Sequence, residues 1–165
     1  MKLNFLRHGL AADRELWEGD DFDRPLTDEG ILRMQKQAKQ MECLNLKLGK
    51  ILSSPLKRAR QTAQIVAEQF GLADSLFEDQ RLSPGFGIPE LAQILQDHAA
   101  LDALIVVGHE PDFSEVVSRL IGGGRIVFKK GGLAQVDILD PIIPSGKLNW
   151  LFTPKSMDRL AMKGK

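Results

Sequence analysis

The sequence predicts an α/β fold, a three-layer αβα sandwich in which helices cover both faces of a mostly parallel central sheet. Short apolar runs alternate with helical patterns over most of the chain, and the C-terminal part is rich in strands. Residues 104–107 form a continuous apolar run, which is typical of a strand buried on both faces. A length of 165 residues fits one domain, so we expect residues 1–165 to fold together.

The first half of the chain predicts two strands and two helices. Residues 3–6 indicate a short first strand, and residues 28–44 indicate a helix because their apolar side chains recur at helical spacing. Thr27 is the expected N-cap of that helix. Residues 51–53 indicate the second strand, and Pro55 is expected in the first turn of the helix that follows.

The second half predicts further helices and strands. A helix begins near Pro89, the buried strand covers residues 104–107, and Pro111 opens another helix. Three strands are then expected, at 125–128, 133–139 and 147–152. The last two are expected to pair through the turn region 141–146.

Composition excludes several classes of function. Lys and Arg number 22 and Asp and Glu also 22, so the chain lacks the basic excess of a nucleic-acid binder. We expect no membrane partner either, since no apolar stretch approaches 18 residues. Arg7 and His8 interrupt the apolar start too early for a signal peptide, and the single Cys43 suits a reducing compartment. We therefore expect a cytoplasmic protein.

Candidate functional residues follow three of the predicted strands. Arg7-His8-Gly9 comes after the first strand, and Ser54-Pro55 followed by Arg58 comes after the second. Gly108-His109-Glu110 follows the buried strand. Ligands of such sheets bind beyond the carboxyl ends of the strands, so we expect these side chains to meet at one edge.

Two histidines with two arginines suit a phosphate dianion better than a metal ion. Arginine repels cations, whereas its forked donors match phosphate oxygens. Neighbouring cations lower the pKa of a histidine and favour the neutral imidazole, which can attack phosphorus. We expect no metal and no cofactor.

Four ordered segments resemble the histidine phosphatase superfamily. Leu6-Arg7-His8-Gly9 is similar to its Arg-His-Gly signature. Three further segments match in order, at 24–30, 53–63 and 107–111. The matches span residues 3–120, and the resemblance implies a phosphoglycerate mutase-like fold.

The resemblance also implies roles for single residues. His8 matches the nucleophile that becomes phosphorylated, Arg7 and Arg58 match the phosphate clamp, and His109 matches a residue that contacts the phosphoryl group. Gly9 belongs to the same signature and is expected among the substrate-binding residues. Arg60 competes with Arg58, but the two lie about 200° apart on a helix and cannot both face one pocket. The family pattern favours Arg58.

Within the superfamily, Arg7-His8-Gly9-Leu10-Ala11 and the short chain look most like SixA-type phosphohistidine phosphatases. The implied partner is a histidine phosphotransfer protein, and phosphate-like anions should bind the same pocket. Two alternatives stay open: a phosphatase of small phosphomonoesters such as sugar phosphates, and a non-catalytic phosphate-binding module.

The sequence departs from the family at the position of the proton donor. Larger members carry a glutamate in the region where Pro84 stands here, and Leu10 replaces an acid that many relatives carry. If a donor exists, Glu110 and Asp79 are the first candidates. The acidic and basic residues of the polar loop 20–24 either contact substrate or are simply solvated.

Overall fold

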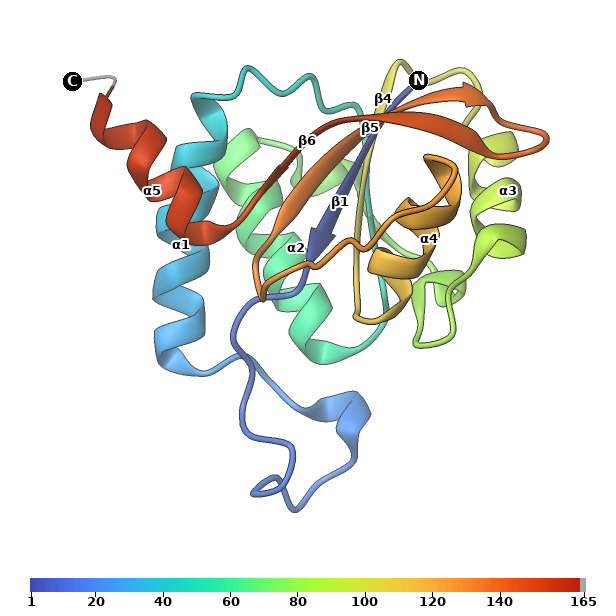
Figure 1. Cartoon of the computed structure of the whole chain (residues 1–165). Helices are drawn as coiled ribbons and strands as arrows, with labels where there is room; N and C mark the ends of the chain where they lie inside the picture. Colours follow the sequence, from blue (N-terminus) through green and yellow to red (C-terminus); the bar gives the residue numbers. More distant parts are fainter. Residues whose placement is uncertain (164–165) are drawn as a thin grey trace.

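A six-stranded sheet in the order β3-β2-β4-β1-β5-β6 forms the middle layer of the computed structural model, which describes residues 1–163 (Figure 1). The strands are β1 (Lys2–Arg7), β2 (Ile51–Ser53), β3 (Leu76–Glu78), β4 (Ala103–Gly108), β5 (Leu133–Asp140) and β6 (Ser145–Phe152). The first four strands of that order pair in parallel, and β5 and β6 add antiparallel pairs. The predicted αβα class and the mostly parallel sheet are confirmed.

Helices cover both faces of the sheet (Figure 1). They are α1 (Asp28–Glu42), α2 (Lys57–Phe70), α3 (Ile88–Asp97), α4 (Asp112–Leu120) and α5 (Pro154–Lys163). Residues of α1, α2 and α5 belong to one buried apolar cluster, and residues of α3 and α4 belong to the other. None of the helices within residues 1–163 is long and apolar enough to cross a membrane.

The alternation of side chains along β1 and β4 supplies both apolar clusters. Phe5 and Val106 pack on the side of α3 and α4, while Leu6 and Val107 pack on the side of α1 and α2. Because both faces of β4 are covered, all six of its residues are buried. The continuous apolar run at 104–107 therefore predicted its position correctly.

The predicted strand at 125–128 is wrong. Positive φ angles at Gly122, Gly123 and Gly124 redirect the chain after α4, and residues 125–128 run without a strand partner. The free edge of β1 is instead occupied by β5. Phe128 is buried against Phe113, with ring centroids 6.0 Å apart, so the apolar run serves packing and not pairing.

Three further features of the secondary structure differ from the expectations. Pro55 lies before α2, because the helix begins only after Leu56, an N-cap in an extended conformation. The short strand β3 and the C-terminal helix α5 were not expected. Thr27 does cap α1, since its side chain accepts a hydrogen bond from the Gly30 N–H at 2.9 Å.

Candidate active site

A cavity of about 830 Å³ opens at the carboxyl ends of the parallel strands. Arg7, His8, Arg58 and His109 all line it, as the strand-end argument predicted. The loop between β1 and α1, which projects from the body in Figure 1, contributes residues 10–14, Asp21 and Arg24. The predicted residues therefore meet in one place, and the polar loop belongs to the cavity wall.

The register of β1 against β4 places the two histidines next to each other. Arg7 is the partner of Gly108 in the parallel ladder, and the His8 N–H donates to the Gly108 carbonyl at 3.0 Å. His8 and His109 follow directly, with ring centroids 5.3 Å apart and planes inclined by 54°. Both side chains are buried.

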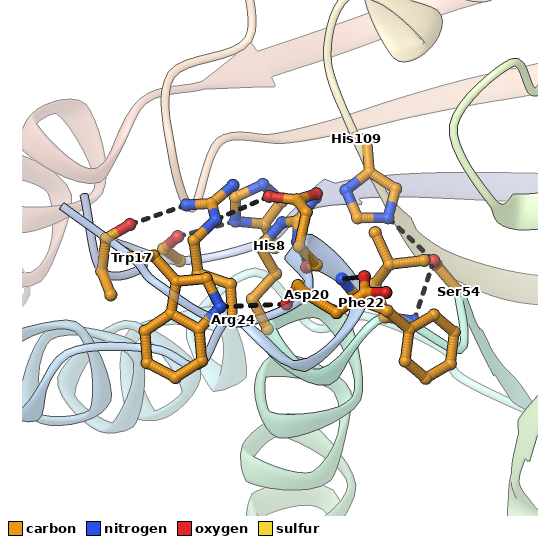
Figure 2. Close-up of polar contacts among 12 residues, drawn as sticks. His8, Trp17, Asp20, Phe22, Arg24, Ser54 and His109 are labelled. Carbon is orange, nitrogen blue, oxygen red and sulfur yellow. Dashed lines mark hydrogen bonds and ion pairs between the residues drawn. The ribbon is translucent and has the colours of Figure 1, made fainter. Parts of the chain in front are cut away.

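Each histidine has one ring nitrogen engaged by the protein. Nδ1 of His8 lies 2.8 Å from the carbonyl oxygen of Gly9, which fixes the proton on Nδ1 and leaves a lone pair on Nε2. Nε2 of His109 lies 2.8 Å from the hydroxyl of Ser54 (Figure 2). Nδ1 of His109 is buried and has no hydrogen-bond partner among the described residues.

Ser54 is a site residue that the sequence analysis passed over. It was noted only as the end of the second strand, yet its hydroxyl orients His109 and also accepts from the Leu56 N–H at 3.3 Å. The available signal was its position, because it follows β2 directly beside the buried β4.

The two arginines of the expected clamp are held by different partners. Arg7 donates from Nη1 to the Phe128 carbonyl at 2.7 Å. Arg58 donates from Nη1 to the Asp21 carbonyl at 2.8 Å and from Nη2 to the Asp21 carboxylate at 3.0 Å. The Nε atoms of both arginines are buried without a partner in the described part of the chain. Each guanidinium therefore keeps one N–H without a hydrogen bond.

Asp21 also holds Arg24, which donates to it from Nε at 2.8 Å and to the Ala12 carbonyl at 2.7 Å. The side chain of Asp20 caps the 3-10 turn Asp21–Asp23, and Trp17 donates to the Asp20 carbonyl at 2.9 Å (Figure 2). Asp21 and Arg24 line the cavity and are hydrogen-bonded there, so they are not simply solvated, and their contact with substrate stays a prediction.

The choice between Arg58 and Arg60 follows the helical geometry. Arg58 is only 4% exposed and lines the cavity, whereas Arg60 points to the other side of α2. Arg60 pairs there with Glu78 at 3.3 Å. The predicted opposition of the two side chains is thus observed.

Gly9 does not lie where a substrate-binding residue is expected. It does not line the cavity, and its N–H already donates to the Thr62 hydroxyl at 3.0 Å. A Cβ atom here would lie 2.6 Å from Cγ of Met34. Close packing of the strand end against α1 therefore explains this glycine, and its amide is not free for a substrate oxygen.

Burial and neighbouring cations keep both imidazoles neutral. Burial lowers the pKa of His8 well below its usual value, and His109, Arg58 and Arg7 add to this effect. Burial and then Arg58 lower the pKa of His109 to about 4. Both rings are therefore uncharged at neutral pH, which leaves His8 the lone pair that a nucleophile requires.

Of the two candidate proton donors, only Glu110 lines the cavity. Its carboxylate accepts from the Ser114 hydroxyl at 2.6 Å and the Ser114 N–H at 3.2 Å, and burial raises its pKa. Asp79 lies outside and is held by Arg81. Burial acts to raise the pKa of Asp79, but the Arg81 hydrogen bonds outweigh it and leave the pKa lowered.

Within residues 1–163, no three His, Cys, Asp or Glu side chains gather closely enough to hold a metal ion. The cavity instead combines cationic and neutral hydrogen-bond donors. Such donors suit an anion with several oxygens.

Comparison with known proteins agrees with this geometry. The family model of the histidine phosphatase superfamily (branch 1) matches residues 3–84. An uncharacterized protein of Picosynechococcus is 40% identical over 139 residues, covering 81% of this chain and 82% of that protein. Phosphohistidine phosphatase SixA of Escherichia coli is 26% identical over 157 residues, covering 93% and 94% of the two chains.

A solved structure of the protein histidine phosphatase SixA in complex with tungstate superposes with a TM-score of 0.83. It is 26% identical, and the match covers 94% of this chain and 98% of that one. The motif segments, the sheet and the phosphatase relatives all indicate the same family and fold. The chain belongs to the histidine phosphatase superfamily, and its phosphoglycerate mutase-like fold is close to that of SixA.

Proposed function

We propose that the protein is a metal-independent phosphatase that forms a covalent phosphohistidine on His8 and removes phosphate from histidine on a signalling phosphotransfer protein. One observation carries this proposal: a neutral His8 whose Nε2 is free lies in one cavity with the half-buried Arg7 and the buried Arg58, each of which has an unpartnered Nε–H among the described residues. The superfamily membership supports the hydrolase class.

The donors around His8 suit a phosphoryl group. Arg7 and Arg58 would each turn a free Nε–H toward its oxygens, and the unpartnered Nδ1 of His109 would supply a third donor. Charge-assisted hydrogen bonds of this kind are about twice as strong as neutral ones. Because these donors are already in place, they also stabilise the charge of the phosphoryl group during transfer.

The reaction would proceed in two steps. Nε2 of His8 attacks phosphorus and forms a P–N bond. The bond between phosphorus and the leaving group breaks, and the leaving group departs with the electron pair and takes up a proton. Water then attacks the phosphohistidine, which releases inorganic phosphate and restores the lone pair on Nε2. His8 keeps its single N–H proton on Nδ1, held by the Gly9 carbonyl, so the phosphorylated ring is cationic until water releases phosphate.

The leaving group decides between substrates. An alkoxide needs a proton from a positioned acid, a contribution of roughly 10²–10⁴-fold. Pro84 lines the cavity where larger relatives carry a glutamate. The imidazole of a substrate phosphohistidine, with an unperturbed pKa of about 6.5, can be protonated near neutral pH and leave without such help. The likeness to SixA supports the same substrate.

The second candidate is a phosphatase of small phosphomonoesters, and Glu110 is the observation that favours it. Its carboxyl lines the cavity and holds its proton more tightly than an exposed glutamate because burial raises its pKa. It would therefore be the proton donor that an alkoxide needs.

A cytoplasmic location belongs to the proposal, since Cys43 is an exposed free thiol that a reducing compartment keeps reduced.

We predict that His8→Ala abolishes both turnover of an aryl phosphate and acid-labile labelling by a ³²P-phosphoramidate. Without Nε2 there is no atom to accept the phosphoryl group. Circular dichroism should show that the variant folds, because His8 lies at a strand end and not in the apolar clusters. Wild-type activity should survive EDTA. Acid-labile phosphate on the variant would contradict the nucleophile, and an unlabelled, inactive wild type would favour a non-catalytic module.

We predict that Arg58→Ala weakens tungstate binding about 10- to 100-fold, since charged hydrogen bonds contribute about 1.5–3 kcal/mol each. The variant also leaves the Asp21 carboxylate uncompensated at the site. Arg60→Ala is the matched control on the same helix and should stay within twofold. Isothermal titration calorimetry checks both variants. Equal losses in the two would mean that Arg58 does not bind the anion.

We predict that kcat/KM for a phosphohistidine peptide exceeds that for a sugar phosphate by about 10²–10⁴-fold, the contribution of the missing acid. Glu110→Gln should leave the peptide rate within a few-fold. A sugar phosphate turned over as fast as the peptide, with Glu110→Gln abolishing only the former, would replace the leading proposal by the phosphomonoesterase.

A further inference from the structure

A second cavity, of about 430 Å³, lies next to the active site between α1, α5 and Lys130. Leu10 and Lys130 line both cavities, so the two are continuous at the mouth of the active site. We call it the α1–α5 groove. Its walls are formed by Gly9, Leu10, Arg33, Met34, Lys36, Gln37, Gln40, Lys130, Pro154, Lys155 and Asp158.

The charges of the groove are strongly unequal. It presents four cations, Arg33, Lys36, Lys130 and Lys155, against the single carboxylate of Asp158, in a chain whose formal net charge is zero. That carboxylate is already engaged, since it accepts from Gln40 at 2.7 Å and pairs with Lys36 at 2.5 Å. Arg33 pairs with Glu29, which lies outside the groove, whereas Lys130 and Lys155 form no ion pair among residues 1–163.

The length of the groove argues for a chain and against a small molecule. From Arg33 to Gln40 it follows α1 for about 10 Å beyond the mouth. About three residues of extended peptide cover this distance. A small phosphorylated metabolite would already fit within the active-site cavity of about 830 Å³.

We propose that the α1–α5 groove binds an acidic segment next to the phosphohistidine of a protein substrate. This inference rests on the proposed function and adds the feature of the partner that the groove recognises. Lys130 would place the first carboxylate at the mouth. Lys155 would attract those further along, together with Arg33, which would exchange its Glu29 partner for the incoming carboxylate. Charge complementarity of this type raises the rate at which the two proteins meet and the specificity of their binding. It should therefore raise kcat/KM for acidic substrates.

The test uses synthetic peptides that carry one phosphohistidine and four Glu residues. The Glu residues stand before the phosphohistidine in one peptide and after it in the other, and each peptide has a counterpart with four Gln residues in their place. The wild type should favour at least one Glu peptide by about tenfold in kcat/KM at low ionic strength. This preference should vanish near 1 M salt, where charges are screened beyond about 3 Å.

The double variant Arg33→Glu/Lys155→Glu should lose the preference for Glu peptides. Its turnover of an aryl phosphate should stay within twofold of the wild-type rate, and this second result would show that the active site is intact. Neither side chain lines the active-site cavity. Lys39→Glu/Lys47→Glu is the matched control, because it changes the net charge equally at exposed positions outside the groove. The control should keep the preference.

Equal wild-type rates on Glu and Gln peptides, or an unchanged preference in the groove variant, would overturn the inference while the proposed function stands. If the control variant also lost the preference for Glu peptides, net charge alone would explain the preference, and the inference would be overturned too. A groove variant impaired on a bisphosphorylated sugar but not on peptides would assign the groove to a metabolite. A wild type inactive on every phosphohistidine peptide would overturn the proposed function and this inference together.

Discussion

The buried guanidinium group of Arg58 and the half-buried one of Arg7 lie beside two imidazole rings, and several contacts of the fold serve to keep them there. Burying a charge is costly unless it is paired and hydrogen-bonded. Asp21 compensates Arg58 through its carboxylate and carbonyl, and the Phe128 carbonyl accepts from Arg7. The compensation is incomplete, since each Nε stays unpartnered. A bound phosphoryl dianion would complete it.

Burial first, and then these cations, lower the pKa of both histidines and so set their protonation. A lowered pKa in the folded protein means that the unfolded chain binds protons first as the pH falls. For His109, with a folded pKa of about 4 against an ordinary 6.5, the free energy of unfolding should fall as the pH drops through that interval. The arrangement that favours a neutral nucleophile therefore makes the fold sensitive to acid.

Much of the site could be predicted because it follows from the topology of a parallel sheet. Arg7, His8 and His109 come at the ends of strands whose apolar runs are unambiguous, and the helical turn of α2 separates Arg58 from Arg60. The contact of Asp21 with Arg58 could not be predicted, since it joins a polar loop without periodicity to a helix 37 residues away. The orienting hydroxyl of Ser54 is also a tertiary contact, made across 55 residues.

The errors in the fold have similar causes. The run at 125–128 contains two β-branched residues and a phenylalanine and so has the composition of a strand, but strand pairing depends on a free edge, and β5 occupies the edge of β1. The three residues of β3 are partly or fully exposed and show no clear alternation, so the sequence carries no signal for them. Gly9 belongs to the family signature, yet its close packing on Met34 became visible only in three dimensions.

Burial in a cationic pocket holds His8 and His109 neutral. An NMR titration of the assigned imidazole rings measures this directly in the free protein. The account predicts an apparent pKa of about 4 for His109 and a value well below 6.5 for His8, with the His109 value rising in Arg58→Gln. Titration of either ring at or above 6.5, or a His109 pKa indifferent to Arg58, would contradict it.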